Sequence, residues 1–276
     1  MRRHRRHAAD HGASNGAAQS RDRRARPRVL ILGGSSDGFA AAEAFLAAGC
    51  EVITSFAGRT ETRRAPVGFA RVGGFGGVSG LAAYLAVEDI ALVVDATHPF
   101  AAIITRNAAA ACAEVGAPLI HVVRPPWTPE PGDDWRVAAD LDSAARMVPV
   151  TDGPCFLTVG RMKIGPFATR RDVRFLIRTV DPPSPPFDHP DTLLINDRGP
   201  FSLDAERALF DEHRIGCLVT ANSGGGAAAA KLVAARERGV PVVVVDRPPP
   251  PQGRVVATVP EAVAAAEEMI GLSMAW

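Results

Sequence analysis

Residues 28–56, RVLILGGSSDGFAAAEAFLAAGCEVITSF, decide the fold that we predict for this chain. The run RVLILGG (28–34) is apolar and ends in glycine, which is typical of a buried parallel strand. The alanine-rich segment 37–49 follows as a helix with Gly49 as its stop, and 51–58 is a second strand. A strand, a helix and a further strand in this order indicate a βαβ unit of a parallel sheet.

The same alternation runs through the rest of the chain. In the first half, a weak third strand leads into the glycine-rich stretch 70–77, followed by helices at 78–89 and 101–116 and strands at 90–97 and 118–126. The proline- and charge-rich bridge 125–135 then interrupts the pattern. In the second half we expect strands at 155–161, 173–180, 215–221 and 240–248 and helices at 202–213, 225–239 and 259–271, with a helix at 140–148 that fits either half.

This pattern predicts an α/β protein of two Rossmann-like domains, in which parallel sheets are flanked by helices and an active cleft lies between the domains. We expect a disordered basic tail over 1–27, a first α/β domain over 28–135 and a second over 136–276. The tail is basic because the first 28 residues hold nine arginines against two aspartates. It is a candidate arm for nucleic acid or a membrane, but we favour a solvated extension and expect neither partner.

The composition is that of an ordinary soluble globular protein, with 276 residues of which 47% are apolar and 22% charged. No apolar run approaches ~20 residues, so no transmembrane helix is expected. The four cysteines form no CxxC pair, so neither a zinc site nor a disulfide framework is indicated, and a reducing cytoplasm is the simplest setting. The oligomeric state has no signature in the sequence.

Ligands of open parallel sheets bind beyond the carboxyl ends of the strands, where the strand order reverses. The loop GGSSDG after the first strand has the composition of a dinucleotide loop, in which glycines permit close approach and the following helix points amide groups at a phosphate. It departs from GxGxxG because Ser35 stands where the second glycine is expected, and a plain strand-to-helix turn is the alternative. The candidate phosphate-binding residues here are Gly33, Gly34, Ser35, Ser36 and Asp37.

The end of the second strand bears on which nicotinamide coenzyme binds. NAD-specific folds place an acidic residue there, whereas this chain has Arg59 and Thr60. A guanidinium binds a 2′-phosphate through two parallel hydrogen bonds, so we favour NADPH over NADH, with an exposed surface arginine as the alternative. Further candidate coenzyme contacts are Ser55, Gly73, Gly74 and Thr97, and Phe75 is a candidate stacking face for a flat ligand.

The stretch VVDATHPFA (93–101) takes a buried strand directly into polar groups. Its His98 is a candidate proton donor near neutral pH, with Asp95 beside it as a second candidate. The alternative is a structural histidine held by Asp95. His121, His189 and His213 have no paired ligand spacing, so no metal site is predicted.

Cations follow several strand ends of the second half. Several arginines and lysines around one cleft suit a substrate with many carboxylates, although scattered solvated charge is the alternative. The segment TANSGGGAAAAK (220–231) adds another small-residue loop at the start of a helix. The candidate substrate contacts are Arg124, Arg161, Lys163, Arg178, Ser223 and Lys231, together with Phe75.

The motifs LILGGSSDG, SFAGRT, RVGGFGG, VVDATHPFA, RPPW, LTVGR, GPF, NSGG and VDRPP occur in this order over residues 28–270. Together they resemble the precorrin-6A reductase and cobalt-precorrin-6A reductase family of cobalamin biosynthesis. The resemblance implies NADPH as hydride donor, bound by the first domain. It also implies a tetrapyrrole polycarboxylate as substrate, of which one ring double bond is reduced. Phe39 departs from the family, which often has an arginine near this position.

Two other functions are alternatives. A short-chain dehydrogenase requires a Tyr-x-x-x-Lys pair, but the only tyrosine is Tyr84 and Glu88 stands four residues on. A non-catalytic module that binds NADP(H) or a small ligand is the second alternative, and turnover of the substrate distinguishes it from the enzyme.

Overall fold

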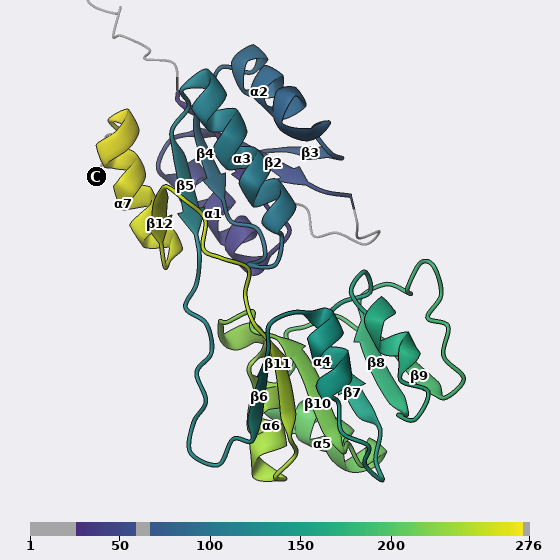
Figure 1. Ribbon diagram of the computed structural model, residues 1–276. Coiled ribbons are helices and arrows are strands. Elements are labelled where there is room, and N and C mark those ends of the chain that lie inside the picture. The colour runs from purple at the N-terminus through teal and green to yellow at the C-terminus, as the bar shows by residue number, and fades with distance from the viewer. Residues whose placement is uncertain (1–25, 59–66, 273–276) are drawn as a thin grey trace, which may run out of the picture.

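The protein is described here by a computed structural model that covers residues 26–58 and 67–272. It forms two six-stranded sheets, which we call the first and second sheet, in the strand orders β12-β5-β4-β1-β2-β3 and β6-β11-β10-β7-β8-β9 (Figure 1). Every strand pair is parallel. The predicted α/β fold with two parallel sheets is confirmed. None of the helices in the described ranges is long and apolar enough to cross a membrane.

The first sheet has helices on both faces. Its strands are β1 Arg28–Leu32, β2 Glu51–Phe56, β3 Phe69–Val72, β4 Ile90–Asp95, β5 Leu119–Val122 and β12 Arg254–Val256. Helices α1 Ser36–Ala47 and α7 Val259–Ile270 share a core on one face. Helices α2 Gly77–Val87 and α3 Ala102–Val115 cover the other face. The central strands β1 and β4 are almost wholly buried, as their continuous apolar runs predict.

The second sheet has shorter helical cover. Its strands are β6 Trp135–Ala138, β7 Cys155–Leu157, β8 Phe175–Thr179, β9 Thr192–Asn196, β10 Cys217–Ala221 and β11 Val242–Val245. Helix α4 Leu141–Met147 and the 3-10 helix η1 Gly165–Thr169 pack on one face. The other face carries α5 Leu203–His213 and α6 Ala230–Glu237, with the 3-10 turn η2 Gly226–Ala228 before α6.

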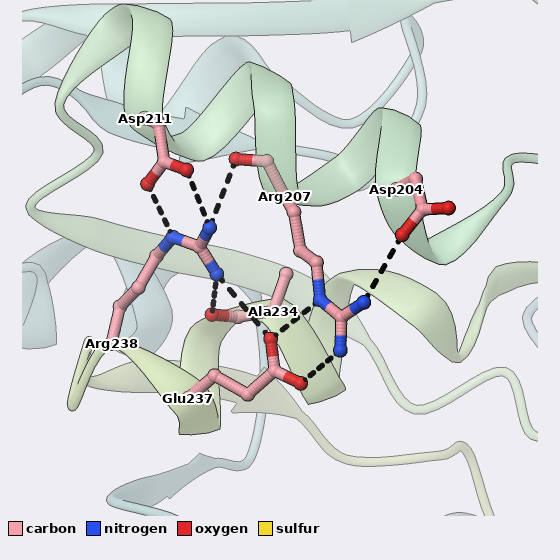
Figure 2. A network of polar contacts seen from close by, with 6 residues as sticks. All are labelled: Asp204, Arg207, Asp211, Ala234, Glu237 and Arg238. Carbon is pink, nitrogen blue, oxygen red and sulfur yellow. Dashed lines mark hydrogen bonds and ion pairs between the residues drawn. The ribbon is translucent and has the colours of Figure 1, made fainter.

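Helices α5 and α6 are also joined by ion pairs on the surface (Figure 2). Arg207 of α5 binds Glu237 of α6 at 2.5 Å, and Arg238 after α6 binds Asp211 of α5 at 2.7 Å. Exposed pairs of this kind contribute little to stability, because water and salt screen the charges. Burial of side chains such as Phe210 and Leu232 between the helices and the sheet therefore dominates the packing.

Each sheet is completed by an edge strand that follows the other sheet in the chain. The chain leaves the first sheet after β5, enters the second through β6 at its edge, and returns after β11 to place β12 beside β5. Figure 1 shows β12 and α7 lying with the first sheet. The expected second domain over 136–276 is thus wrong at its end, because residues 254–270 belong to the first sheet. Parallel pairing with β5, which a local pattern does not encode, decides their place.

The two connections between the sheets are bound to each other and to the second sheet. Arg247 donates from Nη1 to the carbonyl of Arg124 at 2.7 Å and from Nε to the carbonyl of Asn222 at 2.7 Å. The backbone N–H of Trp127 donates to Asn222 Oδ1 at 2.8 Å, and its indole donates to the carbonyl of Gly225 at 2.9 Å. The start of the predicted bridge 125–135 is therefore packed against the loop after β10.

Candidate active site

A cavity of about 540 Å³ lies at the carboxyl ends of β1, β2, β3 and β4. The strand order reverses between β1 and β4, so the cavity is at the point where open parallel sheets bind ligands. Its walls are the loops after these strands, the start of α3, and Arg198 from the second sheet's part of the chain. The predicted site residues that line it are Gly33, Gly34, Ser55, Gly73, Gly74, Phe75, Thr97 and His98.

The loop after β1 forms a backbone cradle. A Cβ at Gly38 would lie 2.8 Å from the Cα of Gly33, so helix α1 approaches the strand more closely than a side chain permits. Gly34 has φ +109 and nothing within 4 Å of its Cβ position, which leaves open space above the loop. Close helix–strand packing and an open glycine backbone are what a dinucleotide requires, so the residues present fit a nicotinamide coenzyme.

The two serines and the aspartate of the predicted phosphate loop have other contacts. Ser35 is the N-cap of α1, where its Oγ accepts from the N–H of Gly38 at 3.2 Å and donates to the carbonyl of Ala96 at 2.7 Å. Ser36 Oγ accepts from Arg124 at 3.4 Å, and an Asp37 oxygen lies 3.5 Å from the same guanidinium. Ser35 thus holds the loop to the end of β4, because its hydroxyl hydrogen is committed to a backbone carbonyl.

Arg71, which the sequence analysis did not select, organises the glycine-rich wall. Its guanidinium donates to Ser55 Oγ at 2.7 Å and to the carbonyls of Gly73 and Gly74 at 3.1 Å each. The guanidinium carbon lies 3.7 Å from the centre of the Phe75 ring. Phe75 is therefore held in the wall by a cation–π contact. An arginine two residues before a pair of glycines was the available signal for this role.

The predicted 2′-phosphate ligands Arg59 and Thr60 lie outside the described residues. The structure describes the segment before them, Ala57 and Gly58, which lines the cavity beyond the end of β2.

Asp95 is a buried, saturated carboxylate. Its Oδ1 accepts from the N–H and hydroxyl of Thr97 at 3.1 and 2.6 Å, and its Oδ2 lies 3.0 Å from His121 Nδ1. Burial acts to raise the pKa of this carboxyl, but hydrogen bonds from His121, Thr97 and Thr105 outweigh it. The pKa of Asp95 therefore lies below its ordinary value, and the group holds Thr97 at the cavity wall instead of carrying a proton.

His98 lies on the cavity wall with its ring partly open to solvent. Its Nδ1 accepts from the N–H of Phe100 at 3.3 Å, so the proton of the neutral ring is on Nε2. The surrounding protein reduces the hydration of the ring, and nearby positive charges add to this effect. Together they lower the pKa of His98 to about 4; the charges are those of Lys163, Arg124, Arg247 and Lys231.

Phe100 connects this loop to the second sheet. Its ring packs against the core beneath that sheet, which includes Val159 and Ile164. Lys163 Nζ lies 4.4 Å from the centre of the ring. The strand end that carries His98 is thus docked on the second sheet's part of the chain, and Lys163 lies beside it.

The other predicted substrate contacts divide into two groups. Arg124 and Arg161 lie between elements: Arg124 donates to the carbonyl of Ser223 at 3.0 Å, and Arg161 donates to the carbonyl of Pro182 at 3.1 Å. Ser223 itself is buried. Of the predicted cations, Lys163 and Arg124 have the largest charge effects on His98, and Lys231 has a smaller one.

Arg178 and Lys231 are instead committed to the interior. Arg178 pairs with Glu206 at 2.6 Å, and its guanidinium carbon lies 3.6 Å from the centre of the Phe201 ring. Lys231 donates to the carbonyl of Ala228 at 2.9 Å. Both side chains are more than nine-tenths buried and neither lines the cavity, so their placement argues against substrate contact. Over residues 26–58 and 67–272, no group of three or more His, Cys, Asp or Glu is arranged to hold a metal ion.

Comparisons with known proteins agree with the motifs. The sequence model of the family described as "Precorrin-6x reductase CbiJ/CobK" matches residues 28–267. A precorrin-6A reductase of Rhodococcus erythropolis is 48% identical over 198 residues, which are 71% of this chain and 79% of the relative. That of Rhodobacter capsulatus is 40% identical over 197 residues, or 71% and 78% of the two chains.

Two further similarities concern the cobalt branch and the fold. A cobalt-precorrin-6A reductase of Priestia megaterium is 28% identical over 212 residues, which are 71% of this chain and 80% of the relative. A solved structure, "CobK precorrin-6A reductase", superposes with a TM-score of 0.85 at 38% identity and covers 90% of this chain and 99% of the other. The predicted fold and family are confirmed.

Proposed function

The chain belongs to the precorrin-6x reductase family, and on this premise we propose that it reduces one ring double bond of metal-free precorrin-6A with NADPH. The observation that carries the proposal is the cavity at the switch point of a family-typical fold, with a glycine cradle that fits a dinucleotide. Metal-free substrate is favoured because the relatives named for it are 40–48% identical, against 27–28% for those named for the cobalt form.

NADPH is favoured over NADH by the residues around the adenosine end. Among the described cavity-lining residues there is no aspartate or glutamate to bind the ribose hydroxyls, as an NAD site requires. Arg59 and Thr60 follow Gly58 in the sequence, where a 2′-phosphate would be bound.

The reduced nicotinamide supplies the hydride, and the protein binds, orients and shields the two ring systems. The cavity walls that place them are largely backbone and apolar side chains, such as Gly73, Phe75 and Ile104. Arg124 and Lys163 are the cations on which we place substrate carboxylates, because they lie close to His98 and the cavity.

His98 is the side chain that we propose as proton donor. Its lowered pKa leaves the ring neutral at pH 7 in the free protein. Carboxylates of the bound macrocycle would offset the positive charges around the ring and so raise its pKa, although burial, the larger cause, still lowers it. The offset favours the protonated ring that a general acid requires. Asp95 is unsuited to this role because it is ionised and its oxygens already accept hydrogen bonds.

The test is an anaerobic assay with metal-free and cobalt-containing precorrin-6A, each with NADPH and with NADH. We expect oxidation of NADPH, together with a gain of two hydrogens in the metal-free macrocycle by mass spectrometry. His98→Asn should lower kcat by about 10²–10⁴-fold while the Kd of NADPH changes little. If both ligands bind but no turnover occurs, the protein is a non-catalytic binding module and the proposal is wrong. Turnover of the cobalt form alone would overturn the substrate assignment.

A further inference from the structure

We propose that Arg198, on the loop after β9 of the second sheet, binds the 2′-phosphate of NADPH held at the carboxyl ends of the first sheet. The inference rests on the proposed function, which supplies NADPH as the coenzyme. It assigns part of the coenzyme site to the other half of the molecule.

The first argument is where Arg198 lies. All other described residues that line the cavity fall between Leu32 and Asn107, in the first sheet's part of the chain. Arg198 comes from the other sheet, and it is the one lysine or arginine among the cavity-lining residues that the structure describes. A coenzyme with three phosphate groups needs cations near it, so a lining arginine is the natural ligand for one of them.

The second argument assigns the phosphate. In this fold the coenzyme's pyrophosphate lies at the N-terminus of the helix after the first strand, and the adenosine ribose lies at the end of the second strand. The cavity wall there is Phe56, Ala57 and Gly58, the end of β2. In Figure 1, β8 and β9 lie below β2 and β3 on the same side of the molecule, away from β5 and β12. Arg198 follows β9 and lines the same cavity as this end of β2.

The third argument is that the loop carrying Arg198 is anchored at both ends. On the β9 side, the N–H of Asp197 donates to the carbonyl of Thr179 at 2.9 Å, and Asp197 Oδ1 accepts from the N–H of Arg198 at 2.7 Å. On the α5 side, the Phe201 ring stacks on the guanidinium of Arg178.

Arg178 is itself fixed by the buried ion pair with Glu206. This pair, which does not line the cavity, thus acquires a positioning role: it holds Phe201 and with it the loop. A loop fixed in advance loses less conformational entropy when its arginine binds an anion.

The experiment measures binding of NADPH and of NADH by calorimetry, with no substrate required. Arg198→Ala should raise the Kd of NADPH by about 10- to 100-fold, as expected for the loss of a hydrogen bond to a charged group. The Kd of NADH should change by less than about twofold, because NADH lacks the 2′-phosphate. Arg198→Lys should recover part of the NADPH affinity. Arg198 is exposed, so these variants are expected to fold.

Arg171→Ala is the matched control, since Arg171 is an exposed arginine of the same half that does not line the cavity. Phe201→Leu tests the positioning role, and it should weaken NADPH binding by less than Arg198→Ala. Unchanged NADPH binding by Arg198→Ala would reject the inference while the proposed function stands. An equal loss for both coenzymes would also overturn it, since the contact would then not be with the 2′-phosphate. A wild-type protein that binds neither coenzyme would instead reject the proposed function.

Discussion

The two sheets have equivalent strand orders, yet within the described residues the large cavity is at the strand ends of the first. In both, the order reverses between two central strands, β1 and β4 in the first and β7 and β10 in the second. In the first, β1 leads through a glycine loop into α1, a helix of 12 residues. In the second, β7 leads to η1, a 3-10 helix of 5 residues. Both topologies provide a place for a ligand, but only the first sheet follows it with a long helix and an open glycine loop, the arrangement that favours phosphate binding.

The residues at the strand ends make the second difference. Ser55 at the end of β2 is small and lines the cavity. On β8, the strand in the equivalent position, Arg178 lies between the rings of Phe156 and Phe201 and pairs with Glu206. The strand ends of the second sheet are therefore filled by a buried charged cluster. The strand ends of the first sheet are thus open to a cavity, whereas those of the second are closed by buried side chains.

The largest expected effect on stability is in the second sheet, whose strand ends are filled by the buried Arg178 cluster. Glu206→Gln keeps the shape of the side chain but leaves the Arg178 charge without its buried partner, so we expect a loss of about 3–5 kcal/mol in the free energy of unfolding. The measurement is urea unfolding followed by circular dichroism. Glu237→Gln, in the exposed network of Figure 2, is the control and should lower the free energy of unfolding far less. Similar small losses for both variants would show that the Arg178 pair is not an essential part of this packing.

The contribution of Lys231, which is also buried in the second sheet's part of the chain, to the stability of the protein depends on pH. Burial, and then the charge of Arg178, lower the pKa of Lys231 to about 8, while Glu206 acts in the opposite direction. The unfolded chain therefore binds more protons than the folded protein between pH 8 and about 10.5, and this side chain adds stability as the pH rises through that window.

Lys231→Met should abolish that contribution. We expect the difference in unfolding free energy between wild type and variant to change by roughly 3 kcal/mol at most between pH 8 and pH 10. Urea unfolding of the two proteins at both pH values measures it. Parallel stability curves for the two proteins would mean that Lys231 does not titrate in this range.

The smallest expected effect on stability is in the first sheet, at whose strand ends the cavity lies. Gly38→Ala places a methyl group 2.8 Å from the Cα of Gly33, so α1 must move away from β1. We expect a loss of about 1–3 kcal/mol in unfolding free energy, together with weaker NADPH binding. Gly165→Ala is the control, because a Cβ there meets nothing within 4 Å. An alanine at 38 that leaves both stability and NADPH affinity unchanged would contradict the close-packed cradle.

The sequence predicted the inner strands well and the outer ones poorly. Strands β1, β4 and β10 are buried on both faces and appear as continuous apolar runs. The sequence analysis missed β6, β9 and β12, which are all edge strands with exposed residues. An edge strand is defined by its hydrogen-bonded neighbour more than by its own composition, so a local pattern does not reveal it.

The candidate site divides in the same way. The glycines and His98 were found because strand ends and glycine loops are local features, and the structure places them on the cavity wall. Arg178 was misjudged, because a cation after a strand has the same sequence pattern whether it faces a ligand or a buried glutamate. Arg71 and Arg198 were missed because their importance depends on contacts across strands and across sheets.

The sequence by itself therefore determined the parallel α/β architecture, the glycine loop after the first strand and the family, since each depends on short-range periodicity or on motifs in a fixed order. Only the tertiary structure decided the exchange of end strands, the burial of Arg178 and Lys231, and the entry of Arg198 into the cavity. These features depend on pairing between segments far apart in the chain, and the free energy of burying a charge is set by the partners that folding brings to it.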